Sequence, residues 1–208
     1  MRFRPISPDR FVEELGRRVL AVDLPYVRVA IDGAAEATDP GALADSLVDP
    51  LRVLGRDVLR VSASDFLRPA SLRYERGRRD PGSRYDGWLD RGALTREVLT
   101  PLAPGGSGTA LPALRDTETD RALRLPRTQL NAPGVLLLDG ELLLGRGLDI
   151  DFGVHLWLSP AALDRRIPGD RHWALPAYRR YEQEAEPLTA ADVVVRVDHP
   201  GSPAVLLR

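Results

Sequence analysis

The sequence predicts a single α/β domain in which helices cover both faces of a parallel sheet. Two observations indicate this class. Short apolar runs of strand length alternate with segments that carry apolar residues at helical spacing, and 208 residues suffice for one such domain with a sizeable core. The content of 43% hydrophobic and 28% charged residues is ordinary for a globular protein. We therefore expect one domain over residues 1–208.

The predicted strands are short and apolar, and most are rich in β-branched residues or bounded by glycine or proline. They cover residues 26–32, 57–64, 134–144, 151–159 and 191–200. The predicted helices carry periodic apolar residues, and an N-cap followed by proline begins the helices after Ser7, Asp39 and Ser159. They cover residues 8–20, 40–55, 90–102, 160–167 and 176–186. We expect Pro50 to kink or end its helix early, and the polar segment 67–90 to be a long loop.

Charge and composition exclude several kinds of function. The net charge of -1 provides no overall field that would attract nucleic acid or an anionic membrane. No apolar run reaches the roughly 18–20 residues of a membrane helix, and the N-terminal residues lack the apolar core of a signal peptide, so we expect a cytoplasmic protein. The sequence has no cysteine and no lysine, and its 29 basic residues are all arginine. Disulfides, thiolate catalysis and lysine chemistry are thereby excluded, and the oligomeric state is left open.

Several short motifs follow one another in a characteristic order. They read RVAIDG, LAD, SDFLRPASLRYERGRRDPGS, YDGWLD, LTPLAPGG, GVLLLDGELLL, RRYEQ and ADVVVRVDHPGSP. From about Arg4 to the C-terminus, this order resembles the P-loop kinases of the uridine kinase type, particularly their bacterial uridine kinase-like branch. The resemblance implies a three-layer α/β/α fold with a five-stranded parallel sheet. It also implies ATP with Mg2+ at the carboxyl ends of the strands, and phosphoryl transfer to the 5′-hydroxyl of a nucleoside such as uridine or cytidine.

The segment after the first long strand stands where this family carries its phosphate loop, G-x-x-x-x-G-K-[ST]. Backbone N–H groups of such a loop cradle phosphates, its lysine bridges the outer ones and its hydroxyl holds Mg2+. The resemblance assigns cofactor binding to Gly33, Ala34, Ala35, Glu36, Ala37, Thr38, Asp39, Pro40 and Gly41. Counting from Gly33 places Asp39 at the lysine, and anchoring on Leu43-Ala44-Asp45 shifts the register by one. Neither register supplies the lysine or the metal-binding hydroxyl.

Asp39 changes the charge of this segment as well as removing a donor. We expect its carboxylate to cap the following helix and so to occupy the anion site that a helix N-terminus offers. Pro40 also removes one backbone N–H. The segment is therefore either a degenerate phosphate loop or an ordinary strand-to-helix turn. An arginine such as Arg68, Arg165 or Arg166 could restore the positive charge but not the metal contact.

The acceptor side is expected in the segment that follows the second strand. In relatives an aspartate there takes the proton of the acceptor hydroxyl; aligned on Phe66 it falls on Ser64, so Asp65, one place later, is the candidate base or else a turn cap. The resemblance assigns substrate binding to Arg68, Tyr85, Asp86, Trp88 and Asp116. Trp88 could stack on a base or close a hydrophobic rim, and Asp116 could equally be a solvated loop residue.

The remaining candidates are the metal carboxylate and the lid. Asp139 ends the apolar strand LLLDG, where relatives hold Mg2+ through water, although Asp139-Gly140 is also a turn dipeptide. A lid-like insert is expected over about residues 160–176, with Arg165 and Arg166 as catalytic candidates or as a solvated helix face. His155 lies in a predicted strand and is expected to be hydrogen-bonded and partly buried.

Two functions remain open at this point. The chain is either an active uridine kinase-like enzyme that uses ATP and Mg2+ with arginines in place of lysine, or a catalytically inactive relative without a cofactor that keeps a binding or structural role. A nucleoside is a candidate ligand in both cases. The overall similarity favours the first description, whereas the joint loss of the lysine, the hydroxyl, the aligned base and part of the lid favours the second.

Overall fold

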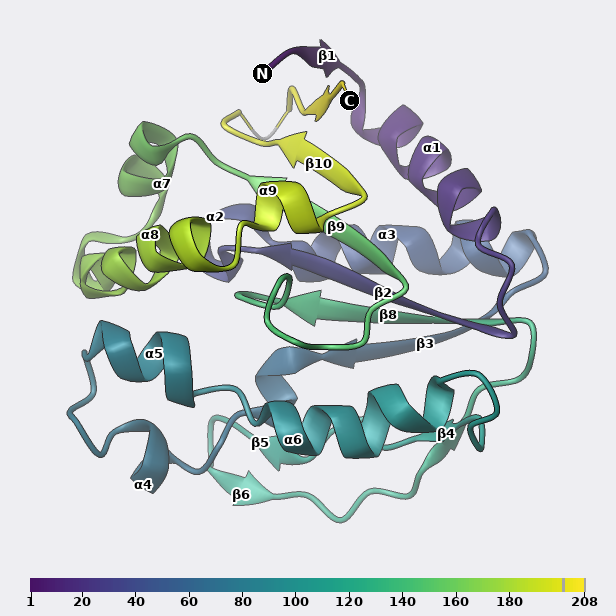
Figure 1. Cartoon of the computed structure of the whole chain (residues 1–208), viewed down its shortest axis with the longest axis horizontal. Coiled ribbons are helices and arrows are strands. Elements are labelled where there is room, and N and C mark those ends of the chain that lie inside the picture. Colours follow the sequence, from purple (N-terminus) through teal and green to yellow (C-terminus); the bar gives the residue numbers. More distant parts are fainter. Residues whose placement is uncertain (200, 208) are drawn as a thin grey trace.

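The protein is described here by a computed structural model that covers residues 1–199 and 201–207. Its main sheet has seven strands, which are Phe3–Pro5 (β1), Tyr26–Gly33 (β2), Asp57–Ser62 (β3), Gly134–Gly140 (β8), Phe152–Trp157 (β9), Val193–Arg196 (β10) and Ala204–Leu206 (β11). Their order is β1-β11-β10-β9-β2-β8-β3 (Figure 1). The five strands from β10 to β3 are parallel, and β11 and β1 add an antiparallel edge. The parallel five-stranded core is therefore confirmed, with an edge that the sequence analysis did not predict.

Helices cover both faces of this sheet and confirm the three-layer arrangement. One face packs against α1 (Pro8–Leu20) and α3 (Pro40–Val53) in a shared apolar core. The opposite face packs against a continuous helical stretch made of α6 (Arg91–Leu94), η2 (Thr95–Leu99) and η3 (Thr100–Leu102). A third apolar cluster joins helices beyond β9, which are α7 (Pro160–Arg166), η4 (Gly169–Ala174) and α8 (Leu175–Glu184). The short helix α9 (Pro187–Ala190) follows α8.

The expected early end of a helix at Pro50 and the expected loop over residues 67–90 were wrong. The helix α3 continues past Pro50 to Val53, because a proline in the last turn removes only one N–H and Leu54 N still donates to Pro50 O at 3.2 Å. The segment 67–90 contains α4 (Ala70–Arg73) and α5 (Pro81–Gly87). Asp80 caps α5 by accepting from Ser83 N at 2.6 Å.

The remaining elements are short. They are η1 (Ala63–Phe66), α2 (Ala35–Thr38), and the strand pairs β4 (Thr109–Ala110) with β7 (Thr128–Gln129) and β5 (Arg115–Asp116) with β6 (Arg121–Ala122). Pro200, the last residue of the predicted closing strand, lies outside the described residues. Within those residues, no helix combines the length and the apolar character needed to cross a membrane.

The register of the parallel strands brings particular polar side chains together at their carboxyl ends. Ser62 of β3 pairs with Asp139 of β8, and Asp32 of β2 pairs with His155 of β9. Directly paired residues in a parallel sheet point to the same face, and residues two apart on one strand do so as well. Arg60 therefore shares a face with Ser62 and Asp139.

Candidate functional site

A cleft of about 500 Å3 opens at the carboxyl ends of β2, β3 and β8. This edge of an open parallel sheet is where ligands generally bind. The wall on the sheet side comes from the start of α3, the end of β3 and the end of β8, and includes Asp39, Gly41, Ser64 and Asp139. The facing wall comes largely from the segment 67–90, and includes Arg73, Tyr74, Arg84 and Trp88.

The turn after β2 is folded in on itself. The N–H groups of Ala37 and Thr38 both donate to Ala34 O at 2.8 Å, and Asp39 N donates to Ala35 O at 3.4 Å. The Thr38 hydroxyl also donates to Ala34 O, at 3.1 Å. A phosphate loop needs such N–H groups to point at the anion. Here they are used within a single helical turn, α2, so this stretch offers few donors to a ligand.

Asp39 completes the closure at the start of α3. Its backbone is left-handed with φ of 49°, a conformation that aspartate tolerates better than most residues. Its Oδ1 accepts from Ala42 N at 3.0 Å, which confirms the predicted helix cap. A Cβ placed on Gly41 would lie 3.6 Å from Asp39 Oδ1 and 3.6 Å from Asp139 Oδ2, so both carboxylates approach the same spot. Two negative groups therefore converge where a triphosphate would need positive charge.

Arg60 supplies the positive charge at this place, and it is directed at Asp139. Its Nη2 lies 2.9 Å from Asp139 Oδ1, and its Nη1 donates to Gly41 O at 3.2 Å. The other carboxylate oxygen of Asp139 accepts from the Ser62 hydroxyl at 3.0 Å. Asp45 of α3 also approaches Arg60 Nη2, at 3.4 Å. Burial raises the pKa of Asp139, and Arg60 opposes that rise.

The residues present do not fit Mg-ATP. Both oxygens of the expected metal carboxylate are engaged, one of them by a cation that would repel Mg2+. At about 4 Å, a like-charge pair costs about 1 kcal/mol in water and about 4 kcal/mol near a protein surface. Asp39 is exposed, so its repulsion of a phosphate falls between these values. We therefore derive no phosphoryl-transfer step through this turn.

The facing wall of the cleft is built from arginines packed on aromatic rings. The Arg84 side chain is buried, donates to Tyr178 Oη at 3.0 Å and pairs with Glu141 at 2.7 Å. Its guanidinium carbon lies 5.0 Å from the Trp88 ring centroid. Arg73, also buried, lies 5.6 Å from the same ring. Cation–π contacts of this kind hold the Trp88 ring in a fixed position in the wall.

The other predicted acceptor residues are spread around the cleft. Ser64, which the resemblance aligns with the base of its relatives, lines the cleft, whereas Asp65 of η1 is not among the lining residues. Burial, with Asp139 and Asp116 nearby, raises the pKa of Asp65. Asp116 accepts from the backbone of Glu118 and Thr119 at 2.9 and 3.2 Å, which lower its pKa and make it a cap of its own turn.

Tyr85 and Asp86 lie on α5 and contact α8 or the loop after β8. The Tyr85 ring lies between the guanidinium groups of Arg146 and Arg180, at 4.0 and 4.3 Å from their central carbons. Asp86 pairs with Arg180 at 2.7 Å. Neither residue lines the cleft, in contrast to Trp88 on the same segment.

The predicted lid arginines also lie apart from the cleft. Arg166 of α7 donates to Val197 O at 2.6 Å, and neither Arg165 nor Arg166 lines the cavity. Arg171 of η4 does line it, and its Nε lies 3.6 Å from Glu36 of α2. Arg60, Arg73 and Arg84 were not among the residues that the sequence indicated. Arg60 lies two residues before Ser62 on one strand, which places it on the same face as Ser62 but does not identify its partners.

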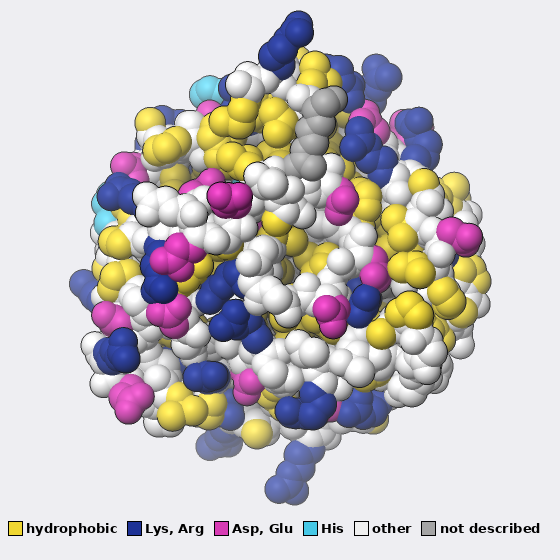
Figure 2. All heavy atoms as spheres, in the orientation of Figure 1, with side chains coloured by type: hydrophobic (Ala, Val, Ile, Leu, Met, Phe, Trp, Pro, Cys, Tyr) yellow, Lys and Arg dark blue, Asp and Glu magenta, His cyan; other side chains and the backbone are white. Residues whose placement is uncertain are grey.

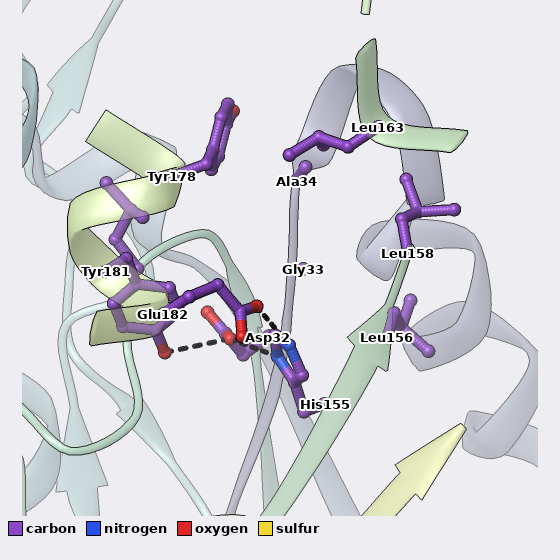
Figure 3. A pocket seen from close by; sticks show the side chains of 11 residues that line it. Asp32, Gly33, Ala34, His155, Leu156, Leu158, Leu163, Tyr178, Tyr181 and Glu182 are labelled. Carbon is purple, nitrogen blue, oxygen red and sulfur yellow. Dashed lines mark hydrogen bonds and ion pairs between the residues drawn. The ribbon is translucent and has the colours of Figure 1, made fainter. Parts of the chain in front are cut away.

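A buried polar network lies directly below the turn after β2 (Figure 3). Asp32, which has no exposed surface, accepts from Leu143 N at 2.9 Å and from the Tyr181 hydroxyl at 2.9 Å, and lies 2.7 Å from His155 Nδ1. Glu182 approaches His155 Nε2 at 3.6 Å. Although burial opposes it, pairing with Asp32 and Glu182 raises the pKa of His155 to about 9. The network ties β2 and β9 to α8, and His155 is hydrogen-bonded as expected but fully buried.

Together, the parallel core of the sheet and the helical layers on its two faces form a three-layer α/β/α fold, with the cleft at the strand ends. Among solved structures, a possible uridine kinase from Bacillus stearothermophilus matches with a TM-score of 0.72 and 23% identity, over 89% of this chain and 97% of its own. A candidate fructose transport system kinase from Silicibacter matches with a TM-score of 0.63 and 18% identity, over 89% and 95%. At the level of sequence, no family profile and no curated protein matches. The likeness therefore establishes the fold, and the function must be argued from the site.

Proposed function

We propose that this chain is a catalytically inactive relative of the P-loop kinases, one that binds a nucleoside-sized ligand in its cleft without Mg-ATP. The observation that carries this proposal is the closed turn after β2. The N–H groups of Ala37, Thr38 and Asp39 are bonded within the turn, the Asp39 carboxylate caps the following helix, and Arg60 neutralises Asp139. Phosphoryl transfer depends mainly on positioning the phosphates and neutralising their charge. This arrangement opposes both, because it places negative charge where the phosphates of ATP would bind.

The cleft itself supports the binding half of the proposal. A volume of about 500 Å3 suits a small ligand. Trp88 and Tyr74 offer aromatic surfaces, and their rings lie 5.8 Å apart at an angle of 78°. Ser64 and Thr117 add hydroxyl groups. A flat base with a polar sugar matches this mixture of aromatic and hydroxyl side chains, and uridine or cytidine is the ligand class that the resemblance suggests.

The alternative is an active uridine kinase in which arginine replaces the missing lysine. Arg171 is the observation that favours it, since this side chain lines the cleft beside Glu36. The two proposals differ in one measurable product. An active enzyme forms ADP when it is mixed with Mg-ATP and uridine or cytidine, whereas an inactive relative forms none above background.

The experiment combines that assay with a thermal shift. Uridine and cytidine are titrated into the unmodified protein, and stabilisation grows with the logarithm of ligand concentration over Kd. We expect the melting temperature to rise with at least one nucleoside and no ADP to form. ADP formation at a rate of about 1 per second or more, which is ordinary for kinases, would establish the active alternative. A melting temperature that millimolar nucleoside leaves unchanged would refute the proposal that the cleft binds a nucleoside.

A further inference from the structure

A second hollow, of about 600 Å3, lies between α6 and the loop that follows β8. It is lined by Arg68, Leu89, Arg91, Gly92, Thr95, Arg96, Thr100, Arg146 and Gly147. We call these residues the arginine groove. The groove shares only Leu89 with the cleft, so the two hollows are separate. Figure 2 shows that several dark blue side chains lie close together near the middle of the face drawn.

The groove carries four guanidinium groups and no carboxylate in its lining. Arg96 pairs with Glu97 at 2.7 Å. Among the residues that the structure describes, no carboxylate oxygen lies within 4.0 Å of the guanidinium nitrogens of Arg68, Arg91 or Arg146. Most other arginines near a cavity are paired, as Arg84 is with Glu141 and Arg60 with Asp139. Three guanidinium groups without a carboxylate partner among the described residues therefore line this one groove.

Two of these arginines are held in position by the protein. Arg91 Nη1 donates to Arg146 O at 3.0 Å, and the Arg146 guanidinium carbon lies 4.0 Å from the Tyr85 ring centroid. Burial and the neighbouring charge of Arg91 lower the pKa of Arg146, while Tyr85 and Asp86 oppose that change. Asp86 is itself paired with Arg180 at 2.7 Å. The groove thus keeps two like charges close together, an arrangement that an anion would relieve.

We infer that the arginine groove is a binding site for a small anion with two or more linked phosphate groups. Guanidinium forks match phosphate oxygens two at a time, and Thr95 and Thr100 add hydroxyl donors on the same wall. No aromatic ring lines the groove, so the phosphates themselves must supply the recognition. The net charge of -1 disfavours a long nucleic acid, which needs an extended basic surface. Inorganic polyphosphate and nucleotide share the required chemistry.

The inference does not depend on the proposed function of the cleft, because no charged residue is common to the two sites. The probe is inorganic tripolyphosphate without metal, titrated calorimetrically into the whole chain at about 50 mM and about 200 mM salt. We expect binding that weakens at least tenfold over this range, as charge pairing with several phosphates requires. ATP without metal is titrated in parallel. Equal affinities would assign the site to the phosphate chain, and tighter ATP binding would assign it to a nucleotide.

Two double variants locate the site. R68Q/R96Q changes two exposed side chains, so its fold should be preserved, and R91Q/R146Q removes the two that are held in position. The matched control R121Q/R124Q removes the same charge from exposed arginines outside the groove. We expect each groove variant to weaken tripolyphosphate binding about tenfold or more, and the control to change it less than about twofold. Absence of measurable binding at about 5 mM probe, or an equal loss in the control, would overturn the inference.

Discussion

Removing the positive charge of Arg60 tests whether an ion pair occupies the expected metal position. In Arg60→Leu, Asp139, whose side chain is 10% exposed, loses its 2.9 Å partner. Breaking a fully buried pair by removing one partner costs about 3–5 kcal/mol. The Arg60 side chain is 26% exposed, and Ser62 remains bound to the carboxylate. We therefore expect the free energy of unfolding to fall by about 2 kcal/mol at neutral pH.

The pH dependence of this loss follows from the direction of the Asp139 pKa shift. Burial already raises the folded-state pKa of Asp139, and removing Arg60 raises it further. A carboxyl group with a raised folded pKa contributes stability at low pH, and this contribution is lost as pH rises through that pKa. The cost of Arg60→Leu should therefore be largest near neutral pH and should shrink as the solution is acidified.

Urea unfolding of the unmodified protein, Arg60→Leu, Asp139→Asn and the double variant measures the pair directly. We expect a coupling energy of about 1–2 kcal/mol, with Asp139→Asn recovering part of the stability that Arg60→Leu loses. A stability change below about 0.5 kcal/mol at neutral pH, or a coupling of zero, would refute the reasoning. In that case Arg60 does not neutralise Asp139 in solution.

Three further outcomes follow from the site. The folded-state pKa of His155 is about 9 against an ordinary 6.5, so its contribution to stability is complete below pH 6.5 and is lost as pH rises through 9. In His155→Asn, the free energy of unfolding measured with urea should lack this decline. The same decline in His155→Asn and in the unmodified protein would show that His155 does not cause it. Trp88→Ala should reduce nucleoside binding by about 1–3 kcal/mol and Trp88→Phe by less, measured calorimetrically, whereas equal effects would exclude stacking. Replacing Thr38, Asp39 and Pro40 with Gly, Lys and Thr in the R68Q/R96Q background should give a larger thermal shift with millimolar Mg-ATP than the background alone. An equal shift would show that the turn still does not bind ATP.

The elements that sequence could predict are those fixed by local chemistry. The Asp39 cap follows from one side chain next to Pro40, and the buried strands follow from their own apolar runs. The segment 67–90 was mistaken for a loop because its helices are short and polar, although Asp80-Pro81 is a start signal. The contacts of Arg60 could not be predicted from the sequence, for a different reason. Its partners lie on α3 and β8, so the contact exists only once the register of β3 with β8 is known.

One fold can carry sites of different chemistry, so the function of this cleft depends on the residues that line it. Gly33 still permits the close approach of the turn to Leu156, where a Cβ would lie 2.9 Å from the Leu156 side chain. The strands still deliver Asp139 to the carboxyl edge of the sheet. The charge around these two positions is set by Asp39 at the start of the helix and by Arg60 beside the carboxylate.

The most direct measurement is a crystal structure of the unmodified protein soaked with millimolar Mg-ATP, because it reports where the triphosphate lies. The account predicts that no phosphate occupies the turn formed by residues 33–41, and that Asp39 continues to accept from Ala42 N while Arg60 continues to pair with Asp139. A β-phosphate bound to the backbone N–H groups of that turn, with Mg2+ beside Asp139, would contradict it.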